Sequence, residues 1–170
     1  MKNVFLAVIF ICSVYNMEGQ STDFCHAVNT IMSDGCNKFR NVKGNLLNAN
    51  ENATTWACGI KVPGTINSRF VASMGLFYEG ALLQTSNKEA LNSVYDTYKV
   101  LLDTCLLSQG YTCSVNENYY PGLSDFKKLV YIYEQPDSSR LLKPQSHVTL
   151  EVASNKNMGI YTIVMYIFDR

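Results

Sequence analysis

The stretch from Ser86 to Leu106, SNKEALNSVYDTYKVLLDTCL, decides the fold class of this chain. It opens on a capping box, in which the Ser86 hydroxyl and the Glu89 carboxylate satisfy free backbone N–H groups at a helix start. Apolar residues then keep the spacing of one helical face until Gly110, which supplies a stop. The sequence therefore predicts a long amphipathic helix packed on a core.

The C-terminal third has the period of strands. Residues 146–152, SHVTLEV, alternate between polar and apolar. This alternation predicts a strand whose valines and leucine face the core, with the intervening residues turned outward: His147, Thr149 and Glu151. Residues 160–168 are apolar on both faces, which predicts a central strand. With candidate strands near residues 112–116 and 129–134, these segments predict an antiparallel meander.

The residues before the long helix add a second helix and more strands. Ser21-Thr22-Asp23 offers N-cap residues ahead of an apolar face, so an amphipathic helix should begin there. Strands are predicted at residues 42–47 and 56–62, with one or two more within residues 69–85. The predicted fold is α+β, with an antiparallel sheet of about five to seven strands and two main helices packed on one face.

The N-terminus has the layout of an export signal. One positive charge at Lys2 precedes an apolar run from Val4 to Cys12, and this run is shorter than the roughly 20 residues of a bilayer-spanning helix. We expect residues 1–19 to be a signal peptide, which leaves residues 20–170 as a single, soluble α+β domain without an integral membrane span. Its location would be periplasmic or extracellular. A lipid anchor on Cys12 is the alternative, and the bulky Ile11 before it disfavours that reading.

Composition and charge bear on the partners. The chain is 47% hydrophobic with only four prolines, which is typical of a globular domain. Its 14 basic residues balance its 14 acidic residues, and the densest basic pair is Lys127-Lys128. Nucleic-acid binders gather a basic excess on one face. The sequence therefore predicts no nucleic-acid partner.

Five of the six cysteines lie beyond residue 19, so at least one of them has no partner within the mature chain. Cys25 and Cys36 would lie about 16 Å apart in one continuous helix, too far for a disulfide unless the chain turns back between them. Cys105 and Cys113 flank a helix stop and could meet across a tight return. We take Cys105 and Cys113 as the candidate disulfide.

The common catalytic and metal-binding patterns are absent from the sequence. Only His26 and His147 could serve a cysteine nucleophile as base, and neighbours on a helix such as Cys25 and His26 do not face each other. No G-x-S-x-G elbow, clustered metal ligands or glycine-rich phosphate loop occurs. The sequence predicts no catalytic residue, metal or cofactor.

Eleven tyrosines are the most suggestive remaining feature. Tyr119 and Tyr120 are adjacent, and Tyr131 and Tyr133 alternate along a predicted strand. Tyrosine rings with hydrogen-bonding tips suit the recognition of proteins or sugars. Tyrosine is also favoured on half-buried sheets. These four tyrosines are a possible ligand platform, with a structural role as the alternative.

Three short segments, FRNVKG at residues 39–44, IKVPG at 60–64 and LLDTCL at 101–106, resemble small exported proteins of Gram-negative bacteria that have no assigned function. The resemblance covers most of the mature chain and carries no catalytic residues. The absence of metal, phosphate and nucleophile patterns favours an exported, non-enzymatic binding or interaction module of the cell envelope, with a protein or carbohydrate partner. The alternative is a hydrolase-type enzyme with a dispersed active site.

Overall fold

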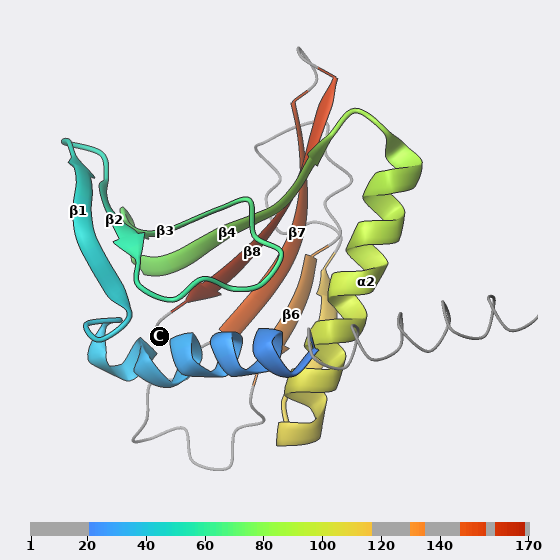
Figure 1. The fold of residues 1–170 in the computed structure, drawn as a ribbon, viewed down its shortest axis with the longest axis horizontal. Coiled ribbons are helices and arrows are strands. Elements are labelled where there is room, and N and C mark those ends of the chain that lie inside the picture. Colours follow the sequence, from blue (N-terminus) through green and yellow to red (C-terminus); the bar gives the residue numbers. More distant parts are fainter. Residues whose placement is uncertain (1–20, 117–129, 135–146, 156–158, 169–170) are drawn as a thin grey trace, which may run out of the picture.

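The computed structural model describes residues 21–116, 130–134, 147–155 and 159–168 (Figure 1). The described helices are the first helix (residues 21–34) and α2 (Lys88–Leu106), each followed by a short 3-10 turn, η1 (Gly35–Asn37) and η2 (Leu107–Gln109). The strands are β1 (Lys43–Ala49), β2 (Thr54–Cys58), β3 (Asn67–Ala72), β4 (Leu76–Thr85), β5 (Thr112–Asn116), β6 (Val130–Glu134), β7 (His147–Asn155) and β8 (Ile160–Phe168). Within these ranges, no helix is long and apolar enough to cross a bilayer.

The strands form one sheet in the order β1-β2-β3-β4-β8-β7-β6-β5, and every neighbouring pair is antiparallel. The predicted α+β class is confirmed. Within the described residues the sheet has eight strands, against the expected five to seven, because residues 69–85 contribute to two strands, β3 and β4, joined by a bend. β4 and β8 lie at the centre, and β1 and β5 are the two ends.

A cross-strand row shows which face of the sheet forms the core. Its members are directly opposite one another from strand to strand, and such residues share a face. From β7 to β1 the row reads Val148, Ile167, Tyr78, Phe70, Trp56 and Leu46. The first four are fully buried. Both helices pack on this face (Figure 1), as expected, and Phe24 of the first helix lies 5.8 Å from Tyr98 of α2 between ring centroids.

A disulfide joins the two helices. Cys25 of the first helix bonds Cys105 of α2 across a sequence separation of 80 residues, with Cα atoms 5.2 Å apart. The expected Cys105–Cys113 bond is therefore wrong. Cys105 lies on the buried face of α2, turned toward the first helix, whereas Cys113 has entered β5 on the sheet and is not in a disulfide.

The start of α2 differs by one residue from the predicted capping box. Asn87, not Ser86, is the N-cap, and its side-chain oxygen accepts hydrogen bonds from the backbone N–H of Glu89 at 2.8 Å and of Ala90 at 3.2 Å. Asparagine and serine cap helices about equally well, so the choice between two adjacent candidates depends on how the chain enters from β4.

A buried carboxylate, Asp34, fixes the turn after the first helix. It accepts hydrogen bonds from the Asn41 backbone at 2.8 Å, the Asn41 amide at 2.5 Å, the Asn37 amide at 3.3 Å and the Val42 backbone at 3.3 Å. Burial opposes ionisation of this carboxyl, but these hydrogen bonds outweigh it and lower its pKa. They hold the turn that delivers the chain into β1.

The loop between β2 and β3 leans against α2. Gly64 has a φ of +83°, a left-handed conformation that glycine adopts without strain. A side chain there would overlap the hydroxyl of Tyr98 on α2. The contact ties the base of the β1–β2 hairpin to the helix layer.

The outward residues of β7 differ from expectation in one respect. The alternation is as predicted, since Thr149 and Glu151 lie on the face away from the helices with His147. All three are nevertheless buried. Alternation specifies the face of a sheet on which a residue lies, but it does not specify whether that face is covered.

Candidate functional site

Of the four tyrosines of the expected ligand platform, two lie within the described residues. Tyr119 and Tyr120 lie outside them. Tyr131 and Tyr133 lie on β6, where the backbone register places them opposite Leu150 and Val148. These are positions of the helix-bearing face. A ligand platform built on these tyrosines stays a prediction.

Two of the candidate residues for a cysteine–histidine site, Cys25 and His147, are engaged in other interactions. Cys25 is in the disulfide, so it cannot act as a nucleophile beside the exposed His26. His147 stacks on Phe168, with centroids 4.5 Å apart, on the face of the sheet away from the helices. Cys113, opposite Tyr133, has the register of the helix-bearing face. The sheet therefore separates this histidine from that thiol.

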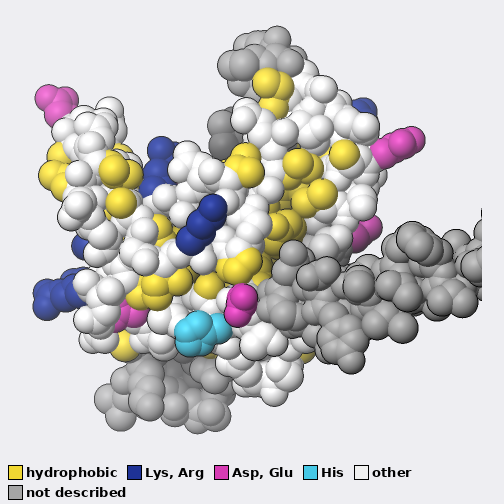
Figure 2. All heavy atoms as spheres, in the orientation of Figure 1, with side chains coloured by type: hydrophobic (Ala, Val, Ile, Leu, Met, Phe, Trp, Pro, Cys, Tyr) yellow, Lys and Arg dark blue, Asp and Glu magenta, His cyan; other side chains and the backbone are white. Residues whose placement is uncertain are grey.

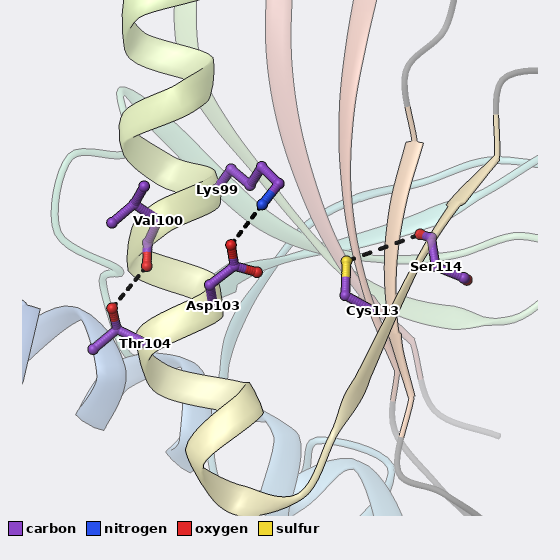
Figure 3. Close-up of polar contacts among 6 residues, drawn as sticks. All are labelled: Lys99, Val100, Asp103, Thr104, Cys113 and Ser114. Atoms are coloured by element: carbon purple, nitrogen blue, oxygen red, sulfur yellow. Dashed lines mark hydrogen bonds and ion pairs between the residues drawn. The ribbon is translucent and has the colours of Figure 1, made fainter.

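Two charged residues of α2 near the thiol of Cys113, Lys99 and Asp103, pair with each other. Figure 3 shows Cys113 on β5 with its sulfur toward α2, and Lys99 and Asp103 projecting from α2. Lys99 and Asp103 form an ion pair at 2.6 Å, one turn apart on the helix. Among the described residues, no group of three or more histidine, cysteine or acidic side chains could hold a metal ion.

A candidate surface emerges where the cross-strand row leaves the core. Phe70 is fully buried, Trp56 on β2 is half-buried, and Leu46 on β1 is 59% exposed. The apolar face of the sheet thus continues past the cover of the helices onto the β1–β2 hairpin. Figure 2 shows this hairpin standing apart from the α2 side of the molecule, with a hollow between them and hydrophobic side chains on both flanks.

The inner face of this hairpin combines an aromatic ring with a cation. The ammonium of Lys43 lies 4.2 Å from the centroid of the Trp56 ring, a cation–π contact. Leu46 lies directly opposite Trp56. We call Lys43, Leu46 and Trp56 the hairpin face. It offers one flat aromatic surface, one aliphatic side chain and one positive charge.

Cys58 is next to the hairpin face, and its thiol is not activated as a nucleophile. Its thiol donates to the carbonyl of Ile60 at 2.7 Å, and burial raises its pKa above the usual value. Burial, with Cys58 nearby, also raises the pKa of the Tyr78 hydroxyl. Neither group is activated for nucleophilic attack, because both are held in the protonated state.

β1 is an open edge of the sheet. It pairs with β2 on one side, and within the described ranges no strand pairs with its other side. All its residues after Lys43 are exposed, including Leu47 at 61%. Two register shifts interrupt its pairing with β2, one between Lys43 and Leu46 and one between Leu46 and Asn48. Such bulges twist an edge and shorten the stretch that can accept another strand.

The second face of the sheet holds an aromatic cluster, which is the alternative candidate site. Phe77 lies 5.8 Å from Tyr166 and 5.3 Å from Phe168 between ring centroids. An ion pair of Arg69 with Glu79, at 2.8 Å, spans neighbouring strands on the same face. The buried His147 closes the end of this cluster. Rings packed on each other in this way fit a structural layer better than a binding platform.

No known protein family, no curated protein and no solved structure matches this chain. The hairpin face was not singled out by sequence reasoning, although Trp56 and its alternating neighbours were assigned to a strand. The adjacent Leu46 and Leu47 were the available signal, because successive residues of a regular strand point to opposite faces and two adjacent leucines therefore do not both face the core.

Proposed function

We propose that this chain is an exported, non-enzymatic binding or interaction module, and that the β1–β2 hairpin is its contact surface. The observation that carries the proposal is the continuation of the apolar cross-strand row onto an open edge, where Trp56 and Leu46 reach solvent. Exposed apolar residues that gather at one place commonly mark an interaction site.

The export half of the proposal has separate support. The N-terminal sequence has a basic residue followed by a short apolar run, and the Cys25–Cys105 disulfide is compatible with an oxidising compartment. If the full chain is expressed in its native cells, we expect the exported product to begin at Gln20. Mass spectrometry of its N-terminal peptide tests this. An exported product that retains residue 1 would contradict the signal-peptide proposal.

The contact surface can be tested by site-specific photo-crosslinking in the native cells. A photo-reactive residue at position 47 of β1 should give discrete crosslinked products. The matched control is position 92, an exposed residue on α2 far along the chain from the hairpin. Equal products at both positions, or none at position 47, would refute the hairpin as the contact surface.

A further inference from the structure

The open edge of β1 offers backbone groups to a partner. Alternate residues of an edge strand direct their N–H and C=O groups away from the sheet, where another extended segment can pair with them. Many recognition domains bind peptides by adding such a strand, with side-chain contacts on both sides of the new strand giving specificity. Leu46, which is largely exposed and lies opposite Trp56, can contact the side chains of an added strand.

The charge of the residues around the hairpin indicates which kind of extended segment would pair with β1. Between residues 34 and 75 the chain has five basic residues and two acidic residues, Asp34 and Glu51, although the whole chain is neutral. The Asp34 carboxylate is buried and accepts hydrogen bonds from Asn37, Asn41 and Val42. Arg69 is paired with Glu79. The other four lie just before β1, at its first residue, or just after β2: Lys38, Arg40, Lys43 and Lys61. Three of these are exposed and Lys43 is half-buried. Figure 2 shows Lys and Arg side chains gathered on this side of the molecule, with an acidic side chain at the hairpin tip.

A second copy of the chain fits this edge less well than a peptide does. Each copy would bring the same basic surroundings, so the two surfaces would repel each other. Each would also bring a strand with two bulges, and two twisted, interrupted edges can match only over a short length. A separate extended segment can follow one bulged edge without a bulge of its own.

We propose that β1 accepts an extended segment of a partner protein as an added strand, and that this segment alternates apolar and acidic residues. This inference rests on the proposed function, of which it specifies the partner. The apolar residues lie beside Leu46 and Trp56 on the helix-bearing face. The acidic residues alternate with them, and those at the hairpin base lie toward Lys38 and Arg40.

The test uses the folded chain from residue 20 and two labelled nine-residue peptides, one alternating valine with glutamate and one alternating valine with lysine. Fluorescence anisotropy measures binding, and backbone amide NMR shifts locate it. We expect the glutamate peptide to bind, with shifts centred on residues 43–49, and the lysine peptide to bind at least tenfold more weakly. Binding should weaken as salt is raised, because the charges are exposed.

Two charge reversals test the basic surroundings. Lys38→Glu with Arg40→Glu should weaken the glutamate peptide about five- to tenfold, since exposed ion pairs contribute modestly. Lys88→Glu, at the exposed start of α2, is the matched control and should leave binding unchanged. Circular dichroism checks that both variants fold.

Other outcomes overturn the inference in distinguishable ways. Equal binding of both peptides, no binding of the glutamate peptide, or shifts away from β1 would refute it. Dimerisation of the chain through β1 in sedimentation would assign the edge to a second copy. If position 47 crosslinks to a partner but the glutamate peptide does not bind, only this inference fails. If position 47 crosslinks to nothing, the proposed contact surface fails as well.

Discussion

Removing the Cys25–Cys105 disulfide should lower the free energy of unfolding by about 4 kcal/mol. The bond closes a loop of 80 residues, and loop-closure entropy in the unfolded chain predicts about 4.5 kcal/mol for a loop of that size. The bond also joins the only two long helices among the described residues, so its loss frees the first helix from α2. The perturbation is the double substitution of Cys25→Ala with Cys105→Ala.

The assay is urea unfolding followed by circular dichroism, with the same measurement on the reduced wild-type chain. Reduction keeps both sulfur atoms, so it separates loss of the cross-link from loss of packing at Cys105, which is buried. The control is Cys36→Ala, because Cys36 is exposed and outside the disulfide. For a domain of this size the expected change is a fall in Tm of roughly 10 °C. A loss below about 1 kcal/mol in both the reduced chain and the double variant would refute the reasoning.

Three further predictions concern Asp34, Gly64 and Cys58, the first two tested by the same unfolding measurement. Asp34→Asn should lower the free energy of unfolding by about 2 kcal/mol at neutral pH, because charged hydrogen bonds are lost. The folded pKa of Asp34 is lowered, so this difference in stability from wild type should persist above the unfolded pKa near 4. It should close as the pH falls through the folded pKa. A gap that is unchanged at pH 2 would contradict this. Gly64→Ala should lower the free energy of unfolding by at least 1 kcal/mol more than Gly110→Ala does. Both glycines have a φ near +84°, but only at Gly64 would the added methyl group overlap a neighbouring side chain. Equal losses of stability would show that the contact with α2 is unimportant. A thiol reagent at pH 8 should modify Cys36 at least tenfold faster than Cys58, whose pKa is raised by burial, as peptide mass mapping can check.

Local patterns predicted the parts of the fold that local physics determines. The stripe from Leu91 to Leu106 predicted α2, because helical spacing depends only on neighbouring residues. The alternation around Val148 predicted β7 in the same way. The burial of Glu151 was not predictable from that alternation, because alternation assigns a residue to a face of the sheet and does not specify whether that face is covered.

The disulfide and the candidate surface depend on the topology of the fold, which the spacing of residues along the sequence does not predict. Cys105 was considered with the nearby Cys113, whereas its partner Cys25 lies 80 residues away and meets it only because two helices share one face. Leu46 was placed correctly in a strand. That this strand is an edge follows from the strand order, which no local pattern in β1 contains.

The size of the sheet relative to its helices explains why a hydrophobic surface remains uncovered. Eight strands spaced about 4.8 Å apart form a sheet about 34 Å wide, whereas a helix with its side chains is about 10 Å wide. α2 runs along the strands near one side and the first helix runs across one end (Figure 1), so neither reaches the far part of the hairpin. The apolar row must therefore end in solvent at Trp56 and Leu46 unless something else covers it. A sheet that only needed to be stable could place polar residues there, as β1 does at Asn45 and Asn48. The half-buried Trp56 and the exposed Leu46 are the reason to look for a partner at this edge.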